Sequence, residues 1–70
     1  MSELSEIIEK EFKEKKTVSL HYLYEKISKD HYTLATGKVL QHRIRAIIST
    51  WNKRNKIRRI SPGTYEIFML

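Results

Sequence analysis

Cysteine is absent from this chain of 70 residues, and proline and glycine are scarce, with one Pro and two Gly. Without cysteine, neither a disulfide nor a thiolate metal site can stabilise so small a core, so the fold has to depend on packing. No apolar run exceeds three residues before the last four residues, which excludes a signal peptide and a membrane-spanning helix. We therefore expect a protein that is not secreted and works in the cytoplasm, at the nucleoid, or in a nucleus.

Acidic residues are missing from a long stretch of the chain. Thirty-five consecutive residues between Asp30 and Glu66 contain no acid, and eight of them are Lys or Arg. Residues 1–36 carry six Lys against seven acids, a net charge of −1, whereas residues 37–70 carry eight basic residues against Glu66 alone, a net of +7. Such one-sided charge attracts polyanions, and nucleic acid is the commonest polyanion in a cell.

The length permits one domain, covering residues 1–70. A domain of this size buries only about 60% of the surface that its unfolded chain exposes, which leaves no room for a deep substrate cavity. The apolar content of 40% is too high for a disordered chain. We expect a folded domain with no small-molecule substrate.

Apolar residues recur at helical spacing in the first part of the chain. One helix is predicted over about residues 3–15, and a second begins after Ser19, which is a suitable N-cap. The β-branched pair Thr17-Val18 interrupts the pattern between them and predicts a very short strand. Residues 28–36 lack sustained periodicity and are expected to form a loop that ends at Gly37.

The third helical pattern is the strongest. Apolar residues fall at steps of four, three and four over a helix predicted at residues 38–54, and Ile48 lies beside them. These residues are Leu40, Ile44, Ile47 and Trp51. The stripe is expected to face the core, with Trp51 buried.

A hairpin is predicted over residues 57–68. Ile57–Ile60 and Thr64–Phe68 are short runs rich in Ile, Tyr and Phe, and Ser61-Pro62-Gly63 separates them. Pro followed by Gly favours a type II turn, which does not match the primed turns of the tightest hairpins, so the register stays open. A pairing of Ile60 with Tyr65 would place Arg59 opposite Glu66. The final Phe-Met-Leu either completes the core or forms an association surface.

The order of helix, short strand, helix, long helix and hairpin is that of a winged helix-turn-helix, an α+β fold that is mostly α. On the third helix, polar residues gather within about 60° of one line opposite the apolar stripe, with no acid among them. They are Lys38, Gln41, His42, Arg45, Ser49 and Asn52. Arg or Lys can donate to guanine, Gln or Asn can pair with adenine, and Ser suits either. We therefore predict that this helix reads base edges in the major groove.

A second set of residues is better placed for the DNA backbone. Basic side chains on the flank and end of the third helix suit phosphates, and polar residues near the hairpin tip suit the backbone or an adjacent groove. The set consists of Arg43, Lys53, Arg54, Lys56, Arg58, Arg59, Ser61 and Thr64. The first set should govern sequence preference and the second overall affinity.

Short motifs at three places carry a family resemblance. They are Ser19-Leu20-His21-Tyr22 leading into Ile27, Thr36-Gly37-Lys38, and the run from Arg58 to Ile67 with its Pro-Gly turn. Together they resemble the winged helix-turn-helix domains, and most closely the HARE helix-turn-helix group. The resemblance covers about residues 3–68 and implies a DNA-binding or chromatin-associated adaptor, with no catalytic residue. The chain departs from the pattern after Gly37, where Lys38-Val39 replaces a frequent Thr-Pro pair.

The sequence gives little support for an active site or a metal site. Glu66 is alone in the basic half, so paired carboxylates are missing there, and no nucleophile, base and orienting group can be named together. His21 and Glu25 have a spacing that can hold a metal, but two ligands do not make a structural site. We expect no enzyme activity, metal or cofactor.

The favoured reading is a protein that binds double-stranded DNA as a small transcriptional regulator. We expect it to act as a homodimer, because one module of this size buries only about 600–1,000 Å² on DNA. Two alternatives stay open. A winged helix can instead dock an acidic protein partner, or it can bind RNA.

Overall fold

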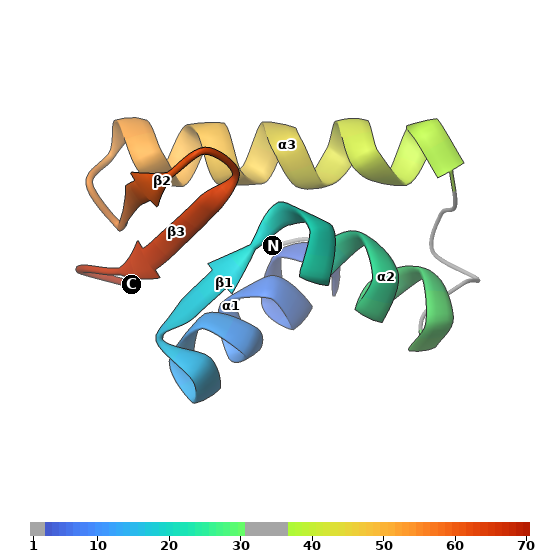
Figure 1. Ribbon diagram of the computed structural model, residues 1–70, viewed down its shortest axis with the longest axis horizontal. Coiled ribbons are helices and arrows are strands. Elements are labelled where there is room, and N and C mark those ends of the chain that lie inside the picture. Colours follow the sequence, from blue (N-terminus) through green and yellow to red (C-terminus); the bar gives the residue numbers. More distant parts are fainter. Residues whose placement is uncertain (1–2, 31–36) are drawn as a thin grey trace.

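Three helices and a three-stranded antiparallel sheet make up residues 3–30 and 37–70, the part of the chain that this computed structural model describes (Figure 1). The helices are α1 (Glu3–Lys15), α2 (Leu20–Asp30) and α3 (Gly37–Lys53), and the strands are β1 (Thr17–Ser19), β2 (Ile57–Ser61) and β3 (Thr64–Ile67). In Figure 1, α3 runs along one side of the molecule, with α1 and α2 on the other side. The predicted α+β class, with a winged-helix layout, is confirmed.

The helix boundaries differ slightly from the predicted ones. α2 continues through Asp30, beyond the start of the predicted loop at residue 28, and Lys26 Nζ lies 3.0 Å from Asp30 Oδ2 one turn later. The hydrogen bond to Asp30 raises the pKa of Lys26. The rest of the predicted loop, residues 31–36, lies outside the described residues. α3 begins at Gly37 and ends at Lys53, so Arg54 lies just beyond the helix.

Two helices end in a left-handed residue that is not glycine. Asn55 has φ 60°, and the N–H groups of Asn55 and Lys56 donate to the carbonyls of Asn52 and Trp51 at 3.2 and 2.9 Å. This pair of bonds is a Schellman motif, which satisfies the last carbonyls of α3 and turns the chain into β2. Lys16 has φ 69° after α1, and its N–H donates to the Phe12 carbonyl at 2.8 Å.

The start of α2 is joined to the hairpin. Ser19 caps the helix as predicted, because its Oγ accepts from the Tyr22 N–H at 3.0 Å. The first N–H of α2, that of Leu20, donates to the carbonyl of Gly63 in the hairpin turn at 2.8 Å. The hairpin is therefore attached to the helix that precedes α3, and its position is determined by the fold.

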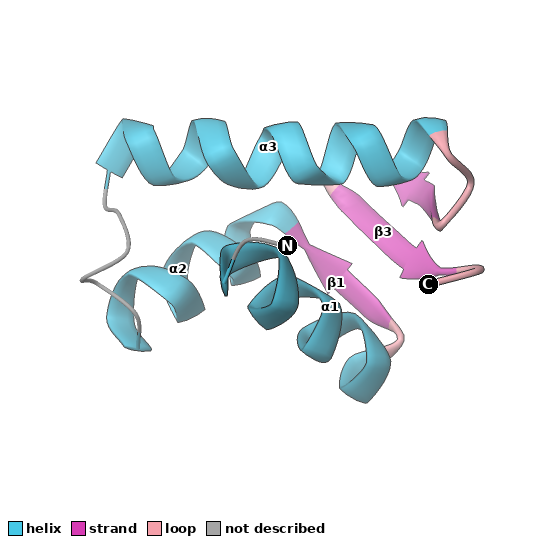
Figure 2. Ribbon diagram, turned by 180° about the vertical axis from the view of Figure 1, so that it is seen from behind, coloured by secondary structure: helices cyan, strands magenta, loops and turns pink. Residues whose placement is uncertain are grey.

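The sheet has the order β1-β3-β2, and Figure 2 shows β3 between α3 and β1. The predicted strand at Thr17-Val18 is present and extends to Ser19. The pairing in the hairpin is shifted from the one considered above, because Arg59 pairs with Tyr65 and Arg58 pairs with Glu66. A bulge between Arg59 and Ser61 leaves Ile60 unpaired. Ser61 then pairs with Thr64 across Pro62-Gly63, where Gly63 has the φ of 75° that a type II turn requires.

The core contains side chains from all three helices and from β1 and β2. Its fully buried members include Ile8, Phe12, Leu23, Ile27 and Ile57, together with three residues of α3, which are Leu40, Ile44 and Ile48. The prediction that Trp51 is buried was wrong, since its side chain is only half-buried. Its ring meets Phe12 edge to face at 6.3 Å, but a shallow depression lined by residues such as Ala46 and Thr50 leaves this flank of α3 open.

The C-terminal residues are divided between the core and the surface. Leu70 packs against the core, whereas Phe68 and Met69 are 51% and 71% exposed. The N–H groups of Phe68 and Met69 both donate to the Lys56 carbonyl, at 3.0 and 2.9 Å. The end of the chain is thus held against the start of β2.

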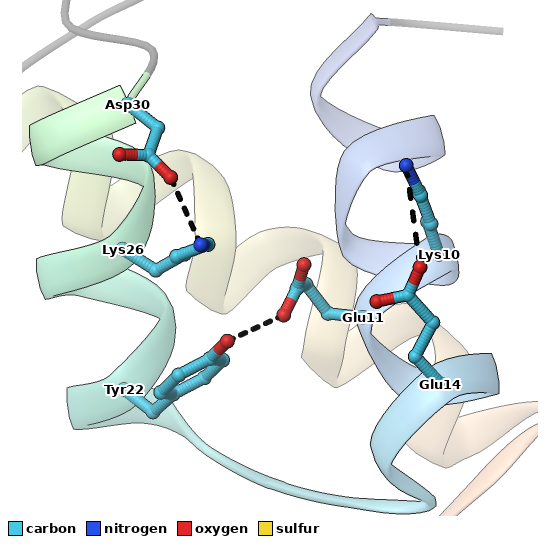
Figure 3. A network of polar contacts seen from close by, with 6 residues as sticks. All are labelled: Lys10, Glu11, Glu14, Tyr22, Lys26 and Asp30. Carbon is cyan, nitrogen blue, oxygen red and sulfur yellow. Dashed lines mark hydrogen bonds and ion pairs between the residues drawn. The ribbon is translucent and has the colours of Figure 1, made fainter.

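A buried carboxylate lies where α1 faces α2 (Figure 3). Glu11 is only 8% exposed, and its Oε1 accepts a hydrogen bond of 2.6 Å from the Tyr22 hydroxyl. Lys15 Nζ stands over the Tyr22 ring, 5.1 Å from its centroid. The hydrogen bond to Glu11, followed by burial, raises the pKa of Tyr22. The bond replaces water that burial removes from the carboxylate.

Substitution of Asn55 tests the end of α3. Asn55→Ala should lower the free energy of unfolding by about 1 kcal/mol, because alanine tolerates positive φ less well than asparagine does. Asn55→Gly should be at least as stable as the wild type, since glycine has no Cβ to resist this conformation. Urea unfolding followed by Trp51 fluorescence measures both. Equal stability of the two variants would contradict the left-handed helix end.

Substitution of Tyr22 tests the link between α1 and α2. Tyr22→Phe should lower the free energy of unfolding by about 1–3 kcal/mol, because the Glu11 carboxylate loses its donor. The folded state raises the pKa of Tyr22, so this contribution is complete below the unfolded pKa of 10.0 and is lost as the pH rises through the folded pKa. Urea unfolding should therefore show a constant difference between wild type and variant at neutral pH that shrinks at alkaline pH.

The matched control for this measurement is Tyr65→Phe. Tyr65 is also half-buried, but its hydroxyl has no hydrogen-bond partner among the described residues. Its loss should change the free energy of unfolding by less than about 0.5 kcal/mol. If Tyr22→Phe behaved like this control, the bond to Glu11 would not stabilise the fold.

Candidate nucleic-acid interface

The polar face of α3 is the largest continuous part of the candidate interface. Leu40, Ile44 and Ile48 are buried, and this orients the opposite side of the helix outward. All six predicted reading residues are exposed there: Lys38, Gln41, His42, Arg45, Ser49 and Asn52. The helix has 17 residues and is therefore about 25 Å long, and the face, from Lys38 to Asn52, extends over about four of its turns.

Four of these side chains surround one hollow on the surface of α3. Lys38, Gln41, His42 and Arg45 line a depression of about 180 Å³. Lys and Arg carry only hydrogen-bond donors, and a protonated His also carries only donors. Gln offers both a donor and an acceptor. The hollow thus gathers donors at a point where the protein has no carboxylate.

Arg45 is held by a residue of another helix. Its Nε donates a hydrogen bond of 3.0 Å to the hydroxyl of Tyr24, which lies on α2. The Tyr24 ring packs against the core, so its hydroxyl has a determined position. The two terminal nitrogens of Arg45 have no partner among the described residues.

A second hollow lies between α3 and the sheet. It has about 280 Å³ and is lined by Arg45, Ser49 and Asn52 from α3, by Leu20 at the start of α2, and by Tyr65 on β3. We call the exposed side of α3 that carries the six predicted reading residues the reading face. Through this second hollow, the reading face continues from α3 to the hairpin. Arg45 lines both hollows and lies where they meet.

The predicted phosphate-binding residues are less closely grouped than the reading residues. At 100° per residue, Arg43 lies about 160° around α3 from Arg45, on the other flank of the helix. Lys53 and Arg54 are exposed at the end of α3, and Lys56 is half-buried where the chain enters β2.

The two arginines of the hairpin lie on opposite faces of the sheet. Arg59 pairs with Tyr65, whose ring faces the hollow beside α3. Arg58 pairs with Glu66 on the other face, and its guanidinium lies 4.4 Å from the centroid of the Phe68 ring. Ser61 and Thr64 form the last pair before the turn. Arg59 is therefore on the side of the reading face, and Arg58 is not.

The ion pairs among the described residues all lie in the N-terminal half of the chain. The four ion pairs among the described residues all join positions i and i+4 within α1 or α2. One of them joins His21 and Glu25, at 3.0 Å, and it is ionic only when His21 is protonated. Within residues 3–30 and 37–70, no three His, Asp or Glu side chains lie close enough to hold a metal ion. The cations of α3 and the hairpin thus keep an uncompensated positive charge.

Two tyrosines of the interface were not predicted from the sequence as site residues. Tyr24 lies 21 residues before Arg45, and Tyr65 lies on the hairpin, so no local pattern joins either of them to α3. Tyr24 also packs at the edge of the core. The packing of both α2 and the hairpin against α3 is needed to bring Tyr24 and Tyr65 to this side of α3.

No protein-family model, curated protein or solved structure shows significant similarity to this chain. Among the described helices, none is both long and apolar enough to cross a membrane.

Proposed function

We propose that this protein binds double-stranded DNA as a small regulator of transcription, with α3 in the major groove and the β2–β3 hairpin as the wing. The observation that carries the proposal is the exposed face of α3, which holds six polar residues and no acid. A major groove about 12 Å wide admits an α-helix, and the donors and amides of this face match the exposed edges of guanine and adenine.

The attachment of the hairpin supports the same arrangement. The hydrogen bond from Leu20 to Gly63 and the pairing of β1 with β3 hold the wing beside α3. A wing in that position can reach the backbone next to the groove that receives the helix. Among residues 3–30 and 37–70, no ion pair involves α3 or the hairpin, which leaves their charge available for phosphates. A homodimer on DNA remains our prediction.

A salt titration tests the function. Affinity for random duplex DNA should fall steeply between low and physiological salt, with a log-log slope of about −0.9 for each phosphate neutralised. Arg45→Ala should weaken binding, because it removes a donor and a charge from the centre of the interface. Fluorescence anisotropy with labelled duplex measures both effects.

Lys13→Ala provides the charge-matched control for Arg45→Ala. Lys13 lies on α1 and is paired with Glu9 at 3.5 Å, so its loss should leave affinity nearly unchanged. A duplex affinity that does not depend on salt concentration, or equal affinities of the wild type and Arg45→Ala, would refute the proposal. A competitor series with structured RNA separates RNA binding from DNA binding, and duplex-independent capture of an acidic protein would favour the docking alternative.

The two adjacent arginines of the hairpin, Arg58 and Arg59, test the orientation of the wing. Arg59→Ala should reduce duplex affinity several-fold and lower the salt slope by about 0.9, because Arg59 lies on the side of the reading face. Arg58→Ala should change affinity less and should instead lower the free energy of unfolding by about 0.5–1 kcal/mol, through the lost contact with Phe68. The reverse pattern would mean that the wing presents its other face to DNA.

A further inference from the structure

The hydrogen bond between Tyr24 and Arg45 joins the centre of the proposed interface to the core. An arginine on a helix surface ordinarily samples many rotamers, so its fork is ordered only when it binds. Here Nε lies 3.0 Å from a hydroxyl whose ring is packed against core residues. The guanidinium is planar, so one bond at Nε restricts the direction in which the terminal nitrogens point.

The terminal nitrogens of Arg45, which the bond to Tyr24 leaves available, match the acceptors of guanine. With Nε occupied, Arg45 presents its two terminal nitrogens side by side, and guanine presents O6 and N7 side by side in the major groove. Adenine offers N7 next to a donor, which the fork cannot match, and a pyrimidine offers no such pair of acceptors. The neighbours of Arg45 around the hollow are Lys38, Gln41 and His42, none of which is a carboxylate that would capture the fork.

We propose that Tyr24 is a positioning residue that holds Arg45 for guanine, and that the DNA sites of this protein contain a G·C pair at the base that Arg45 reads. The inference rests on the proposed function and makes it more specific. Tyr24 accepts from Arg45 and need not touch DNA itself. Its role is to reduce the conformational freedom that Arg45 would lose on binding.

Selection of duplexes from a random library by the wild-type protein provides the DNA for the test. The enriched sites should share a guanine whose replacement by adenine weakens binding by about 5- to 150-fold, the range for one bidentate contact. Replacing it by inosine should preserve binding, because inosine keeps O6 and N7 and lacks only the minor-groove amino group. Replacing it by 7-deazaguanine should weaken binding, because N7 is lost. Sites without such a guanine, or equal loss with inosine, would overturn the inference.

Two variants then separate the roles of Arg45 and Tyr24. Arg45→Lys keeps the charge and a donor but not the planar fork, so the guanine preference should fall while the salt slope stays unchanged. Tyr24→Phe should reduce the preference about 3- to 10-fold, again with an unchanged salt slope, because Arg45 remains but is no longer held. Tyr22→Phe removes a hydroxyl of the same helix that faces Glu11 on α1, away from the interface, and should keep the full preference. A Tyr24→Phe variant with the wild-type preference would overturn the inference.

A measurement without DNA tests the contact itself. In NMR spectra of the free protein, the Arg45 Nε–H should exchange with water more slowly than that of Arg59, for which the described residues offer no such acceptor. Tyr24→Phe should remove the difference, while unfolding in urea shows that the variant is folded. Fast exchange of Arg45 in the wild type would overturn the inference and leave the proposed function standing. Absence of salt-dependent duplex binding would instead refute the proposed function.

Discussion

Burial of the apolar stripe of α3 is the constraint on which the rest of the structure depends. Leu40, Ile44 and Ile48 are removed from water by side chains of α1, α2 and the sheet. Because a helix is rigid, anchoring one side of α3 determines which residues face outward along its whole length. The six polar residues of the reading face owe their common exposure to this packing, and no interaction among them is needed to gather them.

The elements around α3 are joined to one another by main-chain hydrogen bonds as well as by the core. The Leu20 N–H reaches Gly63 in the hairpin turn, and the Ile67 N–H reaches the Lys16 carbonyl at 2.7 Å, after the end of α1. Left-handed conformations at Lys16 and Asn55 let two helices end abruptly and lead directly into strands. A chain of this size has little apolar surface to bury, so such bonds contribute a large share of what holds the hairpin in place.

Charge is distributed so that the two halves of the chain play different parts. Four acids of α1 and α2 lie one turn from a lysine or a histidine and contact it. The arginines and lysines of α3 and the hairpin have no such partners in the described part of the chain, and one of them, Arg45, is held by a neutral hydroxyl instead. A neutral acceptor orients the guanidinium without cancelling its charge, which a carboxylate in the same place would do.

The sequence by itself determined the three helices, the short strand, the hairpin and the exposed face of α3, because each depends on periodicity, capping or turn residues within a short segment. It did not determine the pairing of Arg58 with Glu66, since the bulge at Ile60 arises from fitting a Pro-Gly turn to twisted strands. It also overestimated the burial of Trp51, because periodicity identifies the inward side of a helix and not how far the neighbouring elements extend over it. Only the tertiary structure separated Arg58 from Arg59 and brought Tyr24 to Arg45, because sheet faces and contacts between helices depend on residues that are distant in the chain.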